Sequence, residues 1–220
     1  MIETLGKKRL GLSREEIIRE GKLESNGKLS EILEDLENCG FIRKYHLIGM
    51  KSKSALYQLI DFYTLFFFRF IQDNPVNDEH FWSKSIDTGE YNNWCGLAFE
   101  RVCLLHSRQI KARLGIGGII SSEYAWWVDN EDGKRGTQID LLIDRNDGVI
   151  NLCEMKFTKA PFRIDANYDA ILQYKRSRFI ETSHTQKTVH LTMVSAEGLE
   201  RNSYADEIQS QVTGGDLFAE

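Results

Sequence analysis

The sequence predicts an α/β protein built from two domains. Residues 137–157 read as a β-hairpin in which polar and apolar side chains alternate along both strands. Residues 13–60 read instead as two short helices followed by two strands. Because the chain has 220 residues, it can bury two small cores. We therefore expect a first domain at residues 1–72, a linker at residues 73–90 and a second domain at residues 91–220.

Two helices are predicted at the front of the first domain. Ser13 and Glu16 have the spacing of a capping box, which opens a helix that runs to Glu20. A second helix is predicted to end at Gly40, because glycine readily takes the conformation that closes a helix. Its apolar residues recur at helical spacing and are Leu29, Ile32, Leu33 and Leu36.

Two strand-like runs, residues 41–48 and 55–60, flank a polar segment at residues 49–54 and predict a two-stranded wing. Two helices followed by a wing are the order of a winged-helix domain. The wing lysines Lys51 and Lys53 are candidates for contact with a nucleic-acid backbone. The second helix would be repelled by phosphates, which favours protein packing over DNA recognition. Its charged residues are Lys28, Glu31, Glu34, Asp35 and Glu37.

The segments that flank the second domain carry weaker signals. Residues 59–71 are rich in aromatics and predict a buried linker helix that is too short and too charged to span a membrane. Residues 73–90 are polar and contain Pro75 and Gly89, as a linker does. After Ala196 we expect a short helix and then a frayed end from Thr213.

Composition and charge limit the class of protein. The hydrophobic fraction of 41% and the charged fraction of 28% are ordinary for a globular protein. The net charge of −5 argues against a generally basic nucleic-acid-binding protein. The four cysteines lack Cys-x-x-Cys spacing, so we expect reduced core cysteines and no zinc site. No signal peptide is recognisable at the first residues, and we expect a cytoplasmic protein with no membrane partner.

The register of the predicted hairpin decides which side chains meet. If Asn146 to Gly148 form the loop, Asp140 lies opposite Glu154 and Gln138 lies opposite Lys156. A shorter two-residue turn would place Asp140 beside Met155 instead. The first register separates polar from apolar faces cleanly, and a slip of one residue would reverse every side chain. The apolar face comprises Ile139, Leu141, Ile143, Cys153, Met155 and Phe157.

Opposed carboxylates at Asp140 and Glu154 predict a cation site. Two such charges repel by roughly 3 kcal/mol at about 5 Å in an effective dielectric near 20. A hard divalent cation, Mg²⁺ or Mn²⁺, offsets this repulsion and keeps bound waters. One of those waters can attack a phosphodiester, while Lys156 assists the nucleophile and the transition state. Gln138 would support Lys156.

From about Trp94 to Val194 the chain resembles the PD-(D/E)xK nuclease-like superfamily. That resemblance implies a restriction-endonuclease-like core, an α-β-β-β-α-β arrangement with a mixed sheet. It also implies that Glu100, in the helix containing Gly96-Leu-Ala-Phe-Glu100, is the third acid of the metal site. The second core helix would be residues 166–181, where Lys175 and Arg176 are candidates for contact with nucleic acid, and residues 188–194 would form the returning strand. Ile139 stands where the superfamily signature has proline.

More narrowly, the order Gly-x-x-Phe-Glu, Trp126-Trp127, Gln-Ile-Asp-Leu-Leu and Cys-Glu-Met-Lys-Phe resembles the nuclease-like C-terminal domain of archaeal-type AAA+ ATPases, which follows a winged helix. The resemblance implies a DNA endonuclease, with an ATPase domain as a partner in cis or in trans. The chain itself has no phosphate-binding Gly-x-x-x-x-Gly-Lys-Ser/Thr loop.

Each of these assignments has a structural alternative. Asp140, Glu154 and Lys156 could form a salt-bridged cluster in a domain that uses no metal, and Glu100 could be a surface acid. Lys175 and Arg176 could be a solvated helix face. The protein would then be a non-catalytic accessory or oligomerisation module of an AAA+ ATPase, because fold alone does not imply function. A homo-oligomer stays open as well.

Overall fold

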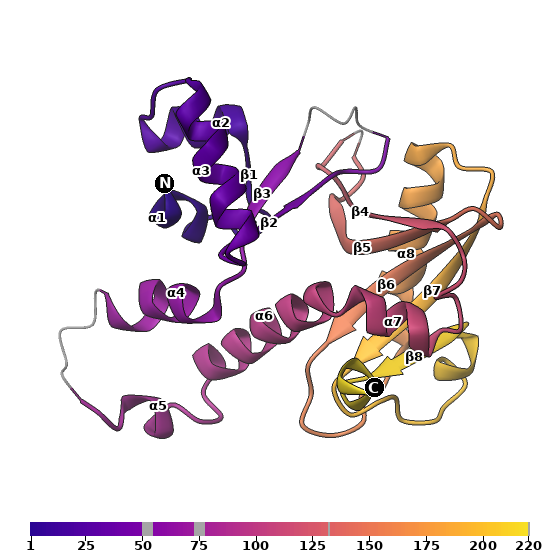
Figure 1. Cartoon of the computed structure of the whole chain (residues 1–220). Coiled ribbons are helices and arrows are strands. Elements are labelled where there is room, and N and C mark those ends of the chain that lie inside the picture. Colours follow the sequence, from indigo (N-terminus) through magenta and orange to yellow (C-terminus); the bar gives the residue numbers. More distant parts are fainter. Residues whose placement is uncertain (50–54, 73–77, 132, 220) are drawn as a thin grey trace. The chain divides into compact units, whose positions relative to one another are not determined.

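The computed structural model describes residues 1–49, 55–72, 78–131 and 133–219 (Figure 1). The chain divides into two compact units, Met1–Ser85 and Ile86–Glu220. The first contains a three-stranded antiparallel sheet and the second a mixed five-stranded sheet, so the predicted α/β class is confirmed. No helix among the described residues is long and apolar enough to cross a membrane.

Two helices of the first unit begin at residues whose side chains cap them. The predicted capping box is present: the Glu16 amide donates to Ser13 Oγ at 3.2 Å, and the Ser13 amide donates to Glu16 Oε2 at 2.8 Å. Asn26 caps the next helix through a hydrogen bond from the Leu29 amide. These caps satisfy amides that have no partner within the helix. The elements are α1 (Ile2–Gly6), α2 (Arg14–Gly21) and α3 (Gly27–Asn38).

The sheet of the first unit has the order β1-β3-β2, with bounds Leu12–Ser13, Leu56–Leu59 and Ile42–Tyr45 respectively. Both pairings are antiparallel, as the two wing-like runs predict for β2 and β3. Strand β1 and helix α1 were not expected from the sequence. The candidate phosphate contacts Lys51 and Lys53 lie outside the described residues.

The aromatic segment after β3 differs from the expected helix at residues 59–71. Leu59 belongs to β3, and a helix begins only after Asp61, which caps it through the Thr64 amide. The segment consists of α4 (Phe62–Phe66) followed by a π-helical turn (Phe67–Ile71). Tyr63 is 72% exposed, so the expected burial is only partial. The rings that contact one another are Phe66, Phe70, Phe81 and Trp82, the last two from α5 (Phe81–Lys84).

The sheet of the second unit has the order β4-β5-β6-β7-β8. The first three strands form an antiparallel meander, and β7 and β8 then add in parallel. Parallel addition requires a crossover, which a helix between β6 and β7 provides. The bounds are β4 (Ser121–Val128), β5 (Thr137–Arg145), β6 (Val149–Lys156), β7 (Thr188–Ser195) and β8 (Ser210–Thr213).

The register of the β5–β6 hairpin is the one predicted from alternation. Leu141 pairs with Cys153 and Asp144 with Ile150, and Asn146 to Gly148 form the loop. Gly148 has a φ of +84°, a conformation that glycine adopts at no steric cost. The recorded pairs end at Leu141 and Cys153, and β5 is bulged against β4 between Ile139 and Leu142, so the predicted opposition of Asp140 and Glu154 is not among them.

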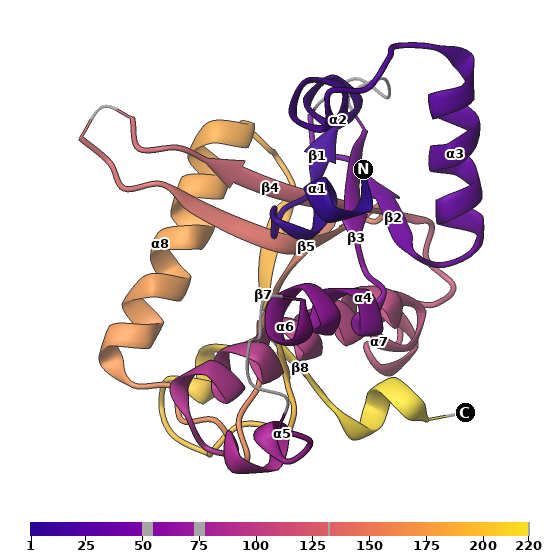
Figure 2. The same ribbon diagram turned by 90° about the vertical axis from the view of Figure 1, so that its left-hand side faces the viewer.

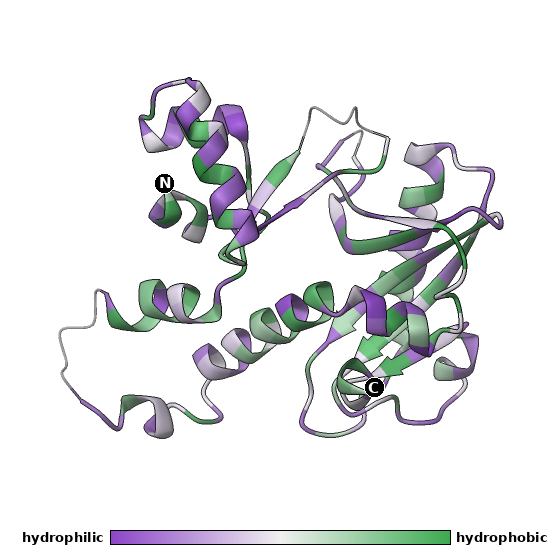
Figure 3. Cartoon of the chain, viewed as in Figure 1, coloured by the Kyte–Doolittle hydropathy of each residue, from purple (hydrophilic) through white to green (hydrophobic). Residues whose placement is uncertain are grey.

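Helices cover both faces of the five-stranded sheet (Figures 1 and 2). Helices α6 (Gly89–Leu105) and α7 (Ser107–Arg113) pack on the face of Leu141 and Cys153, with which their buried residues share one core cluster. Helix α8 (Ala166–Ser183) covers the other face, where Phe179 packs edge-on against Trp126 at 5.5 Å. Figure 3 shows hydrophobic residues along the strands between these layers.

The described residues after Ala196, which run to Ala219, include a paired strand and buried side chains, so the expectation of a frayed end from Thr213 is wrong. Strand β8 pairs with β7, and 3₁₀ turns precede and follow it at Ala205–Glu207 and Gly215–Phe218. Val212 and Leu217 are almost completely buried in the core cluster of α6 and α7. Burial of these two side chains offsets the entropy of ordering the segment.

The four cysteines are free, as expected, but they are not all in the core. Cys103 and Cys153 are buried, whereas Cys39 is exposed and Cys95 is partly exposed. Burial raises the pKa of the Cys103 and Cys153 thiols far above their usual range, which makes both thiols unreactive.

Candidate functional site

Helix α8 turns one stripe of side chains toward the sheet. Asp165 caps the helix by accepting a hydrogen bond from the Tyr168 amide at 2.8 Å, which fixes where the helix begins. From Tyr168, helical spacing leads to Leu172, Lys175 and Phe179. Leu172 and Phe179 are completely buried. Tyr168 and Lys175 therefore lie on the sheet-facing stripe, although each has a polar end.

Glu154 of β6 receives both of these polar ends. The Tyr168 hydroxyl donates to Glu154 Oε1 at 3.0 Å, and Lys175 Nζ donates to Glu154 Oε2 at 2.6 Å. The Glu154 and Lys175 side chains are only 17% and 15% exposed, so water screens this ion pair little. Burial and the negative charge of Glu154 together raise the pKa of Tyr168 well above its ordinary value, so the hydroxyl stays a donor.

Lys156 lies two residues after Glu154 and therefore on the same face of β6. Its ammonium group is 5.1 Å from the ring centroid of Tyr168 and 5.5 Å from that of Phe162. Among the described residues Lys156 has no salt bridge, and these cation–π contacts hold its charge beside the Glu154 cluster. Tyr168 thus contacts both members of the Glu-x-Lys motif.

Asp140 of β5 is half-buried and accepts a hydrogen bond from Gln138 Nε2 at 3.3 Å. The two residues lie two positions apart in β5. Gln138 was expected to support Lys156, and the contact recorded for it is instead with Asp140.

A bulge in β5 between Ile139 and Leu142 interrupts the alternation at Asp140. Ile139 pairs with Trp126 on the face of α8. The recorded pairs therefore do not place Asp140 on the face that carries Glu154.

Glu100 is buried beside an arginine, so the alternative that it is a surface acid is wrong. It lies on α6, which packs on the sheet face opposite to α8. Its side chain is 7% exposed, and its Oε1 is 3.1 Å from the guanidinium of Arg101, which is 2% exposed. Among the residues the structure describes, no three His, Cys, Asp or Glu side chains form a group that could hold a metal ion. Glu100, Asp140 and Glu154 are thus not gathered into one such group.

The candidate nucleic-acid contacts on α8 have different surroundings. Lys175 faces the sheet and pairs with Glu154, whereas Arg176 is half-buried and forms no ion pair with another described residue.

Tyr168 was not predicted from the sequence as a member of the site. The signal for it was the spacing of Tyr168, Leu172 and Phe179, which marks an inward stripe that includes Lys175.

The chemistry of the cluster suits a cation. Glu154 already binds the ammonium of Lys175, so its carboxylate sits where a positive charge is favourable. Asp140 and Glu154 provide hard oxygen donors of the kind that Mg²⁺ and Mn²⁺ take. A divalent ion would have to replace Lys175 at Glu154 Oε2. Glu154 fits such an ion, and Lys156 on the same face adds a positive charge that a phosphate would meet.

Comparisons with known proteins add no relative to this picture. No protein-family model, no curated protein and no solved structure matches the chain.

Proposed function

We propose that the second unit is a metal-dependent nuclease that hydrolyses phosphodiester bonds in DNA. Asp140 and Glu154 would bind Mg²⁺ or Mn²⁺, and Lys156 would assist the attacking water. The observation that supports this most is the convergence of Glu154 and Lys156 on Tyr168. A wider enzyme would include an ATPase domain in cis or in trans.

The residues of the chain have separable tasks in this proposal. The Tyr168 hydroxyl holds one oxygen of Glu154 and so orients the carboxylate. Lys156 places a positive charge between aromatic rings, where it can stabilise negative charge that develops on the scissile phosphate. A bound Mg²⁺ or Mn²⁺ supplies Lewis acidity and a water of lowered pKa. Lys175 pairs with Glu154 when no divalent ion is bound.

A second function is favoured by the saturation of Glu154. Both of its oxygens already accept hydrogen bonds within the unit. Such a satisfied cluster suits a non-catalytic accessory or oligomerisation module of an AAA+ ATPase, in which Glu154 and Lys175 stabilise the fold. The two functions differ in whether a divalent ion displaces Lys175.

The test is nicking of supercoiled plasmid with Mn²⁺ or Mg²⁺, alongside calorimetric titration of Mn²⁺. Wild type is compared with Asp140→Asn and Lys156→Ala, and with Asp129→Asn as a control, because Asp129 is an exposed acid just after β4. We expect nicking by wild type and Asp129→Asn, loss of nicking in both site variants, and loss of Mn²⁺ binding in Asp140→Asn alone. Wild type that neither binds Mn²⁺ nor nicks DNA would refute the nuclease and favour the accessory module.

A further inference from the structure

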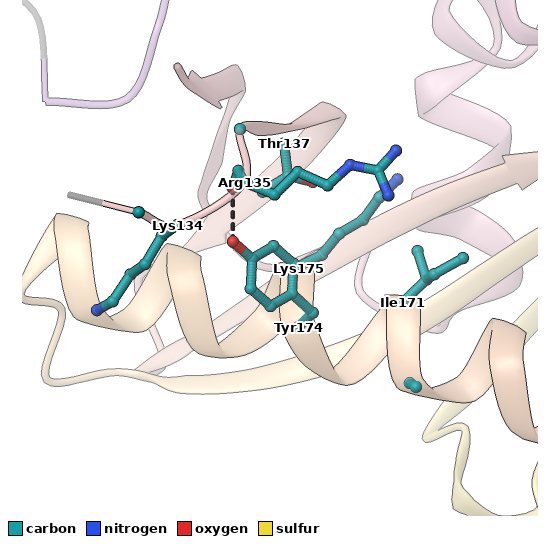
Figure 4. Close-up of a pocket in the computed structure, with 9 residues that line it drawn as sticks. Lys134, Arg135, Thr137, Ile171, Tyr174 and Lys175 are labelled. Carbon is teal, nitrogen blue, oxygen red and sulfur yellow. Dashed lines mark hydrogen bonds between the residues drawn. The ribbon is translucent and has the colours of Figure 1, made fainter. Parts of the chain in front are cut away.

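A cavity of about 500 Å³ opens between α8 and the loop that precedes β5 (Figure 4). This volume is in the range of small-molecule sites. The cavity adjoins the candidate nuclease site, because the two share Lys175, which lines the cavity and pairs with Glu154. The lining residues used below are Lys134, Arg135, Ile171, Tyr174 and Lys175.

The rim of the cavity is held in place by the loop's own bonds. The Tyr174 hydroxyl donates to the carbonyl of Arg135 at 2.5 Å and ties the loop to α8. The Gly136 amide donates to Asn130 Oδ1 at 2.6 Å. A Cβ at Gly136 would lie 2.8 Å from the carbonyl oxygen of Val128, so the close approach of the two chain segments requires glycine.

The charges on the lining are of one sign. It includes Lys134, Arg135 and Lys175 and no acidic residue. Lys134 is ion-paired with Glu181 and Lys175 with Glu154. The exposed guanidinium of Arg135 forms no ion pair with another described residue, and Figure 4 shows it pointing to the same end of the cavity as Lys175. This end is therefore electropositive, and arginine binds phosphate in a bidentate manner.

The rest of the wall is apolar. Ile171 is 43% exposed, and the ring of Tyr174, one helical turn away, lines the same cavity. An aromatic ring and an aliphatic side chain form a surface on which a nucleobase can stack. A phosphate next to a flat, apolar base is the combination found in a nucleotide.

We infer that this cavity binds a nucleoside monophosphate moiety, with the phosphate at Arg135 and Lys175 and the base against Ile171 and Tyr174. The inference rests on the proposed function for the identity of the bound molecule as one unpaired nucleotide of the nucleic-acid substrate. Lys175 then links the two sites, because its ammonium has three donors and can contact the phosphate while it stays paired with Glu154.

The experiment is a titration of the full chain in EDTA, so that no cleavage can contribute, by NMR or calorimetry. The probes are AMP, adenosine, inorganic phosphate and a short single-stranded oligodeoxyadenylate. Arg135→Ala and Ile171→Asp are compared with Arg163→Ala, a control that removes an exposed arginine paired with Glu200 outside the cavity. Thermal unfolding establishes that each variant is folded.

We expect AMP or the oligomer to bind wild type and Arg163→Ala equally, and about tenfold more weakly to Arg135→Ala and Ile171→Asp. Binding of the oligomer without AMP identifies a strand as the source of the nucleotide, and binding of AMP identifies the free nucleotide. Failure of both to bind wild type, equal affinity for inorganic phosphate and AMP, or binding unchanged by both cavity variants would overturn the inference. Nicking without nucleotide binding would refute the cavity alone, and nucleotide binding without nicking would refute only the nuclease.

Discussion

Replacing Glu100 by glutamine removes a buried negative charge 3.1 Å from the buried guanidinium of Arg101. Loss of one partner of a buried ion pair costs about 3 to 5 kcal/mol, because the remaining charge keeps its desolvation penalty. We take the lower end, about 3 kcal/mol, since glutamine retains an oxygen that can accept a hydrogen bond. For a protein of this size that loss lowers the Tm by about 10 °C.

The assay is chemical and thermal unfolding of Glu100→Gln against two comparisons. Glu90→Gln makes the same change at an exposed position on the same helix, and we expect a loss below about 1 kcal/mol. Arg101→Met combined with Glu100→Gln removes both charges, and we expect it to recover part of the stability lost in Arg101→Met alone.

The result that would refute this reasoning is unchanged or increased stability of Glu100→Gln. If Glu100 were a metal ligand, replacing it by glutamine would stabilise the metal-free protein, because the charge would no longer repel the other carboxylates of the site. Unchanged stability together with weakened Mn²⁺ binding would assign Glu100 to the metal site, as the family resemblance implies, and would remove it from the role of counter-ion to Arg101.

Three smaller changes test other parts of the structure. Ser13→Ala removes the capping box of α2 and should lower the free energy of unfolding of the first unit by about 1 kcal/mol in a denaturant titration; no change would show that the cap contributes nothing. Burial raises the pKa of Asp216, but hydrogen bonds from Thr213 and the charge of Arg113 outweigh it and leave that pKa below 3.8. The ionised Asp216 therefore stabilises the fold above its unfolded pKa, and this stabilisation is lost as pH falls through the folded pKa. Asp216→Asn should lower the free energy of unfolding by about 1 to 2 kcal/mol at neutral pH and by little in strong acid. A loss that is the same at every pH would contradict this direction of the pKa shift. Lys175→Met removes the ammonium that competes for Glu154, so calorimetry should show several-fold tighter Mn²⁺ binding, and weaker binding would argue that Glu154 is not a ligand.

The hairpin at the centre of the candidate site was predictable because its signals are local. Asn146 to Gly148 specify the loop, and the alternation beside it predicts the register that the pairs from Leu141 to Asp144 adopt. The bulge of β5 between Ile139 and Leu142 was not predictable from that alternation. Helix α8 was predictable to within two residues for a similar reason, since its cap and periodicity lie within the segment itself.

Partners that come from distant segments were not predictable. Lys175 has an ordinary position in an amphipathic pattern, and nothing near it in sequence shows that it meets Glu154 on another element. The resemblance to a superfamily singles out Glu100 in the sequence. Its burial beside Arg101, however, depends on which sheet face α6 covers. Such contacts depend on how the elements pack against one another, which the local sequence does not specify.

Strand β8 was missed because four residues before a glycine pair carry little strand signal. Its pairing with β7 depends on the crossover that brings residues 205–218 back to the sheet. The local sequence Thr213-Gly-Gly-Asp resembles a frayed terminus, and only the burial of Val212 and Leu217 reveals that it is part of the core.

Strand β8 also shields the sheet from unwanted association. A fragment that stopped before Ser210 would leave β7 as an edge strand with unpaired amides and carbonyls along Thr192 to Ser195. The side chains of these residues are buried in the full fold, so the fragment would expose them together with the unpaired backbone groups of the edge. Such edges template pairing between molecules and lead to aggregation. Shortened versions for solution work should therefore extend at least to Phe218.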